Sequence, residues 1–127
     1  MSSSVHWNAI DGAITTNDAT PTTILAIPAS DPNVSIRVDL TVIARNPTTS
    51  DGKTWNQLLL VDKTGGQTPT MPVAAQNVTA PMGTLGSASW ALATSFEGSN
   101  IFIQVQGQLG SSINWFASAS PVAVMGD

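Results

Sequence analysis

The feature that most constrains the fold is the alternation VSIRVDLTVIAR at residues 34–45. Apolar side chains occupy every second position from Val34 to Ala44, and the positions between them are polar except for Ile43. Because side chains alternate between the two faces of a strand, this pattern predicts a half-buried β-strand. Its second face carries Arg37 and Arg45, two of the four basic residues in the chain, and must meet water, a ligand or another copy of the protein.

Similar strand patterns, separated by turn residues, continue along most of the chain. The expected strands are residues 22–27, 34–45, 54–63, 73–79, 87–96, 101–109 and 113–124. No segment has a convincing helical period, and parallel sheets need crossover helices. The sequence therefore predicts an all-β fold, an antiparallel β-sandwich of jelly-roll-like type.

The length of 127 residues predicts a single domain with one core. Residues 1–12 show no clear period and are expected to form a short N-terminal arm, which leaves residues 13–127 as the sandwich domain. The core is expected to include apolar residues that share one strand face, namely Val38, Leu40, Val42, Trp90, Leu92, Ile103, Val105 and Trp115.

The composition excludes several classes of partner. Charged residues make up 9% of the chain and its net charge is −4, so the clustered Lys and Arg that nucleic-acid binding requires are missing. No apolar run approaches the roughly 20 residues of a membrane span, and the first residues lack the features of a signal peptide. A surface of uncharged polar residues is poor at keeping a monomer in solution. We therefore expect a surface that packs against another protein.

Residues suited to catalysis are few. His6 is the only histidine and lies near the start of the chain, so a Ser–His–Asp triad would depend on the expected arm. Most of the eight acidic residues occupy turn signals, and none has metal-ligand spacing, which leaves calcium binding through loop aspartates as a weaker alternative. With no cysteine and no phosphate-binding loop, we expect a protein that is not an enzyme and has no cofactor, metal or catalytic residues.

Four tryptophans remain as candidate functional residues. Trp90 and Trp115 share strand faces with apolar neighbours and are expected in the core. Trp55 and Trp7 are less constrained, and an exposed aromatic ring offers a flat face on which a sugar ring can stack. These two residues are therefore the candidate platform of an alternative function, a carbohydrate-binding module.

Several short motifs occur in a fixed order along the chain, namely T-N-D-A-T-P-T-T-I at 16–24, V-I-A-R at 42–45, S-A-S-W-A-L at 87–92, I-x-V-x-G at 103–107 and I-N-W-F-A at 113–117. This order resembles a β-rich domain of tailed-bacteriophage virion proteins, and the resemblance spans residues 14–124. Arg45 would match the Arg of its V-x-A-R strand and Trp90 the Trp of its A-x-W strand. Gly107 and Trp115 would match its final G…W pair.

The resemblance implies a β-sandwich virion component, a homotrimer, with no catalytic residues. Fibre proteins of this kind carry a long N-terminal shaft, whereas only a dozen residues precede the domain here. A bare domain is expected instead to be a capsid decoration (cement) protein on the head surface, assembled in the cytoplasm of the bacterial host. Its expected partners are the major capsid protein and further copies of itself. A short tail or neck fibre, or a receptor-binding tip, is the alternative.

The residues expected to contact the capsid or a neighbouring copy come from two places. His6 and Trp7 belong to the expected arm, and Arg37, Asp39 and Arg45 belong to the second face of the strand at 34–45. Pairing of that face within one subunit is the simpler alternative.

Overall fold

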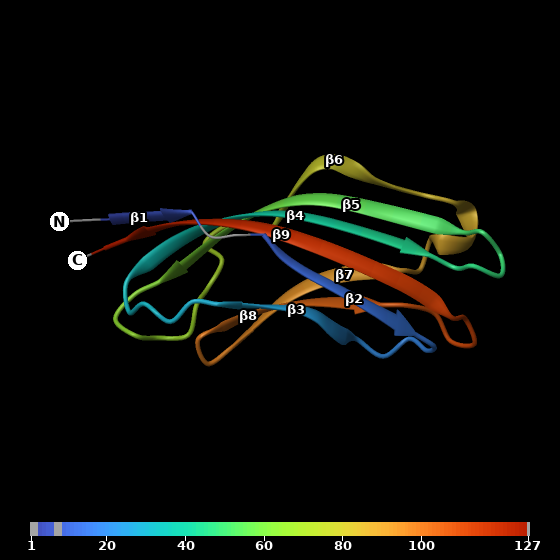
Figure 1. The fold of residues 1–127 in the computed structure, drawn as a ribbon, viewed down its shortest axis with the longest axis horizontal. Coiled ribbons are helices and arrows are strands. Elements are labelled where there is room, and N and C mark those ends of the chain that lie inside the picture. Colours follow the sequence, from blue (N-terminus) through green and yellow to red (C-terminus); the bar gives the residue numbers. More distant parts are fainter. Residues whose placement is uncertain (1–2, 7–8, 127) are drawn as a thin grey trace.

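The computed structural model describes residues 3–6 and 9–126, with side chains described from residue 9 onward. The described chain is built almost entirely of strands (Figure 1). These are β1 (Ser3–His6), β2 (Ile10–Thr16), β3 (Thr22–Pro28), β4 (Val34–Arg45), β5 (Gly52–Lys63), β6 (Gln76–Gly83), β7 (Ala91–Glu97), β8 (Asn100–Gln106) and β9 (Ile113–Met125). A short 3-10 helix, η1 (Leu85–Ser87), follows β6.

Two antiparallel sheets pack face to face. The large sheet has the order β1-β9-β4-β5-β6, with β2 also paired to β9, and the small sheet has the order β3-β8-β7. This arrangement confirms the predicted all-β antiparallel sandwich, while its jelly-roll character stays a prediction. Among residues 3–6 and 9–126, no helix is long and apolar enough to cross a membrane.

Strand β4 is the centre of the large sheet. It pairs along its whole length with β5 on one side and β9 on the other. Its alternate residues from Val34 to Ala44 are buried, as the sequence predicts, and those between them are exposed. Since burying one such side chain contributes roughly 1.5–3 kcal/mol, β4 is a major source of the stability of the core.

Tryptophan rings fill one end of the core. The ring of Trp115 stacks on Trp55 with centroids 5.7 Å apart and packs against Trp90 at 6.1 Å. The indole N–H of Trp115 donates to Thr16 Oγ1 at 2.9 Å, so this buried donor is satisfied. Of the expected core residues, Leu92 is partly buried against the core; the buried ones are Val38, Leu40, Val42, Trp90, Ile103, Val105 and Trp115.

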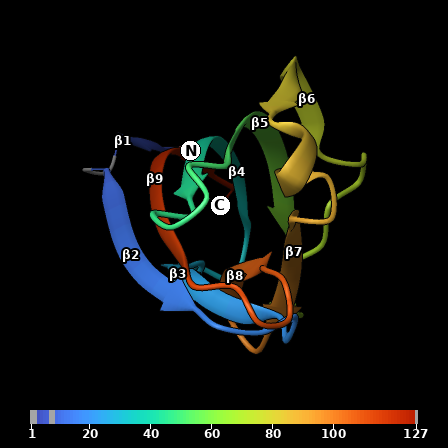
Figure 2. The same cartoon turned by 90° about the vertical axis from the view of Figure 1, so that its right-hand side faces the viewer.

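One long side of the sandwich is closed by β2. Figure 2 shows β2 curving from β9 toward β3, and the backbones of β2 and β3 come close together at Gly12. A Cβ atom at Gly12 would lie 2.3 Å from the carbonyl oxygen of Ile24, so only glycine fits this approach. We call this side the closed side. Residues 3–6 and 10–12, within the expected arm, are strand residues paired with β9.

The opposite side, which we call the open side, carries β6 and η1. Every residue of β6 is exposed, and its pairing with β5 shifts register twice. The strand expected at 73–79 therefore lies later, at β6. Residues 87–90, expected to begin a strand, instead complete η1 and a turn, and the strand begins at Ala91.

A buried lysine joins the sheets at the end near the chain termini. The side chain of Lys63 on β5 is only 4% exposed. Its ammonium donates to the carbonyl oxygen of Ala29 at 2.7 Å and to Ser99 Oγ at 3.1 Å. Lys63 thereby ties the large sheet to two loops of the small sheet.

Candidate functional site

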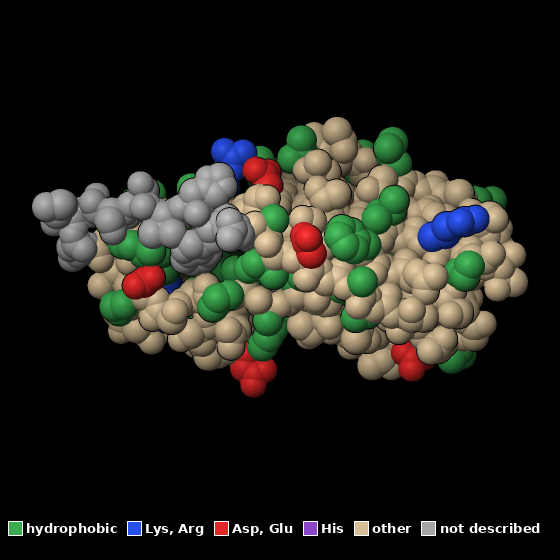
Figure 3. Space-filling model, viewed as in Figure 1, with side chains coloured by type: hydrophobic (Ala, Val, Ile, Leu, Met, Phe, Trp, Pro, Cys, Tyr) green, Lys and Arg blue, Asp and Glu red, His purple; other side chains and the backbone are tan. Residues whose placement is uncertain are grey.

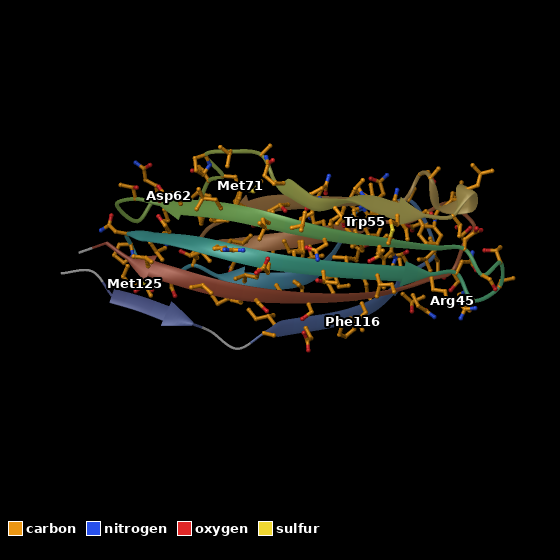
Figure 4. The ribbon with its side chains drawn as sticks, turned by 90° about the horizontal axis from the view of Figure 1, so that it is seen from above. Arg45, Trp55, Asp62, Met71, Phe116 and Met125 are labelled. Carbon is orange, nitrogen blue, oxygen red and sulfur yellow. The ribbon has the colours of Figure 1, made fainter. Side chains whose placement is uncertain are left out.

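The candidate site is the outer face of the large sheet, the face turned away from the small sheet. Arg45 and Phe116 lie toward one end of this sheet, and Asp62, Met71 and Met125 lie toward the other (Figure 4). Because β4 alternates strictly, its outward side chains, Arg37 and Asp39 among them, form the middle row of this face. In the view from the side of β2 and β9, the described surface carries few charged and scattered apolar side chains (Figure 3).

Strand register brings apolar side chains together at the end of the outer face far from the termini. Ile43 lies opposite both Thr54 and Phe116, and Thr54 lies opposite Met82. Ile43 is 54% exposed, Phe116 47% and Met82 67%. We call Ile43, Met82 and Phe116 the distal patch.

A groove of about 510 Å³ runs beside two residues of the distal patch, Ile43 and Met82. Its other lining residues include Ser50, Thr54 and Thr84, and Arg45 and Lys53 also contribute to its walls. The Lys53 ammonium donates to the carbonyl oxygen of Trp90 at 3.0 Å. The groove is therefore apolar along its length, and the guanidinium of Arg45 supplies the freer positive charge.

The second apolar group lies nearer the termini. Arg37 is opposite Leu60 on β5 and Val122 on β9, and a groove of about 280 Å³ runs beside them. Leu58, Leu60 and Val73 line this groove with Arg37. We call Leu58, Leu60, Val73 and Val122 the proximal patch. Polar residues of the middle rows, Thr41, Asn56 and Ser118, separate the two patches.

The charges of the two patches differ. Near the proximal patch, Arg37 Nη2 lies 3.8 Å from Asp39 Oδ2, and both side chains are exposed. Such a pair contributes little to stability. Arg45, beside the distal patch, makes only a long contact of 3.4 Å from Nη2 to Ser50 Oγ, and no ion pair to it exists within the described part of the chain.

The rim of the distal groove is held by Asp51. Its carboxylate accepts hydrogen bonds from the hydroxyls of Thr84 (2.7 Å) and Thr49 (2.8 Å). These bonds, the one from Thr84 first, together with a backbone hydrogen bond from Gly86, lower the pKa of Asp51 below its ordinary value of 3.8. The β4–β5 loop and η1 are thus joined by charge-assisted hydrogen bonds.

The residues predicted as contacts are only partly brought together. Arg37, Asp39 and Arg45 all lie on the outer face, but Arg37 and Arg45 are separated by eight residues of extended strand, about 26 Å. Trp7 and the side chain of His6 lie outside the described residues. The backbone of His6 pairs with Val122.

The structure corrects the prediction for Trp55. Its side chain is only 5% exposed, and its ring stacks on Trp115 inside the core. The ring is therefore closed to a sugar, and the carbohydrate-binding alternative loses its described aromatic residue. Pairing of Val42 with Trp55 turns this side chain to the buried face of the sheet.

The sequence analysis missed the apolar residues of the outer face. Phe116 and Val122 stand at alternate positions of β9, and Leu60 and Leu58 at alternate positions of β5. Their period-two spacing could have indicated an apolar outer face. However, both faces of β5 and β9 carry apolar residues, so the spacing does not show which residues are exposed. In the described part of the chain, no group of three His, Asp or Glu side chains could hold a metal ion. The arrangement is suited to packing against a protein surface.

No protein-family model and no curated protein matches this chain. Among solved structures, it is similar to the tailspike protein of Acinetobacter baumannii phage AM24, with a TM-score of 0.42 and 9% sequence identity. The alignment covers 92% of this chain and 26% of the tailspike chain, so the chain spans about a quarter of that protein. A likeness at this level carries no functional argument, and the function is argued from the outer face and the sequence motifs.

Proposed function

We propose that this protein is a structural component of a tailed-phage virion, a decoration (cement) protein bound to the major capsid protein on the head surface. The observation that carries the proposal is the outer face, which exposes two apolar patches on a broad sheet with few charges. A monomer gains nothing from such a surface, whereas an assembled protein buries it. The order of the sequence motifs, which resembles phage virion domains, supports the same function.

The proximal patch is the part of the outer face that we assign to the capsid shell. Leu60 and Val122 supply apolar contact, and the exposed Arg37–Asp39 pair supplies charges of both signs beside them. Binding of this kind would depend mainly on apolar burial and only weakly on salt, because exposed charges contribute little to the binding energy that salt could screen. A protein that binds the expanded shell in preference to other states stabilises it by mass action.

Immunogold electron microscopy of virions that carry this protein tests the proposal. Antibody raised against the purified chain should place gold over the heads. Gold at the neck or tail would support the fibre alternative and overturn decoration. Intact virions without gold on any part would overturn the virion function itself.

The number of copies is a separate part of the proposal. The resemblance implies three copies around a symmetry axis, whereas the outer face favours two copies around a two-fold axis, so these two expectations exclude each other. Sedimentation of the purified chain counts the copies without any virion, so this part can fail while the location on the head stands.

A further inference from the structure

We infer that the distal patch is a contact between two copies of this chain, related by a two-fold axis. The inference deepens the proposed function by naming the partner of one half of the outer face, and it rests on that proposal only in treating the outer face as an assembly surface. The capsid shell would then meet the proximal patch alone.

The first argument is that a protruding side chain stands beside a groove. Leu85 in η1 is 95% exposed and directly follows Thr84, which lines the distal groove. A two-fold rotation presents each copy's Leu85 to the groove of the other copy. Contacts of this kind are isologous, since the same patch serves both subunits, and they are the commonest in homo-oligomers.

The second argument is charge complementarity. Arg45 lines the distal groove, and Asp51 stands in the chain between two further lining residues, Ser50 and Gly52. Within one copy they form no ion pair among the described residues. The two-fold rotation brings each Arg45 toward the Asp51 of the other copy, which makes the patch complementary to itself. In contrast, Arg37 near the proximal patch already has Asp39 at 3.8 Å.

The third argument is that the patch is held in one shape before it binds. Thr84 and Gly86 are both tied to the carboxylate of Asp51. A Cβ atom at Gly86 would press against the Asp51 carboxylate, so a larger residue in η1 would have to displace this hydrogen-bonded side chain. A surface that is ordered in advance loses little conformational entropy on association.

Sedimentation equilibrium of the purified full chain tests the inference, with loading concentrations from about 1 μM to about 1 mM. The expected result is a reversible dimer of twice the 13.1 kDa chain mass. Met82→Asp should raise the dimer Kd at least about 30-fold, because it places a carboxylate in the centre of the contact. Leu85→Ser should raise the dimer Kd about tenfold. Because the Leu85 side chain is exposed, this substitution should leave the fold unaffected.

Leu60→Asp is the matched control, because Leu60 is 44% exposed on the same sheet face but lies in the proximal patch. It should change the dimer Kd by no more than about threefold. Near-UV circular dichroism of the stacked Trp55–Trp115 pair reports whether each variant keeps its core.

A wild-type chain that stays monomeric, or that forms a trimer, would overturn the inference. So would a folded Met82→Asp or Leu85→Ser variant that dimerises as the wild type does. Failure of the virion proposal looks different, because gold would be absent from heads while the purified chain still dimerises.

Discussion

The two long sides of the sandwich are built differently. On the closed side, β2 spans from β9 toward β3, and Gly12 lets the two backbones meet. On the open side, β6 is exposed along its whole length and η1 extends beyond it. On the closed side, the close contact between the backbones of β2 and β3 stabilises the fold. On the open side, the side chains of β6 are exposed and form a surface. Stability and function are therefore expected to respond to substitutions on different sides.

The largest effect is expected at Gly12. A valine there would drive its Cβ into the carbonyl oxygen of Ile24, and we expect the free energy of unfolding to fall by about 3 kcal/mol or more. Val78→Ala on the exposed β6 is the matched substitution on the open side. It should change the free energy of unfolding by no more than about 0.5 kcal/mol. Urea denaturation measures both. Equal effects at the two positions would remove the contrast between the sides.

The two tryptophan hydrogen bonds offer a finer comparison. The Trp115 indole donates to Thr16 on the closed side, and the buried Trp90 indole donates to the exposed Gln108 at 3.3 Å. Thr16→Val leaves a buried donor unsatisfied and should cost about 1–3 kcal/mol. Gln108→Leu should cost less than about 1 kcal/mol, because this bond is longer and lies at the exposed Gln108, where water competes for it. Chemical denaturation measures the free energy of unfolding of both variants. A larger loss for Gln108→Leu than for Thr16→Val would contradict the expected order.

Binding to the shell separates the two patches of the outer face. Leu60→Asp should weaken cosedimentation with shells stripped of this protein about tenfold or more, because it places a charge in the apolar contact. The control is Leu85→Ser, because Leu85 lies on the open side, away from the proximal patch. This variant should bind shells with the wild-type affinity per chain. The two proteins are compared at concentrations at which both have the same oligomeric state. The reverse pattern would assign the shell to the distal patch.

The smallest effect is expected for the titration of Asp51. Hydrogen bonds from Thr84, Thr49 and Gly86 lower its pKa below 3.8 in the folded chain. Their stabilisation is therefore fully present above pH 3.8 and is lost as the pH falls through the lowered pKa. Carboxyl NMR should give a midpoint below 3.8, and Thr84→Val should raise it toward that value. A midpoint at or above 3.8 in the wild-type chain would contradict the role of these bonds.

Strand β4 shows how much of the fold the sequence predicts. Its alternation is uninterrupted, so residues 34–45 are recognised with their correct ends and their correct buried face. Strand β2 was missed because its pattern is broken at Gly12, where the glycine is needed for contact with β3. That contact joins segments through space and leaves no periodic signal.

The candidate site was predictable only in its middle row. Arg37, Asp39 and Arg45 follow from the alternation of β4. Trp55 is a candidate sugar platform in the sequence because β5 is apolar on both faces between Leu58 and Val61, so the pattern of this strand does not say which face is buried. Pairing with β4 decides this, because Trp55 lies beside Val42 and must point the same way.

The sequence by itself determined that this chain forms antiparallel strands, and which side of β4 enters the core, because the period of two is a local property of an extended backbone. The tertiary structure decided which strands became neighbours. Only that pairing places Met82 and Phe116 on either side of the Ile43–Thr54 pair. Only the approach of η1 to the β4–β5 loop sets Leu85 next to Thr84 at the groove that Arg45 also lines. A surface assembled from distant segments has no period in the sequence, so its patches became visible only in the folded chain.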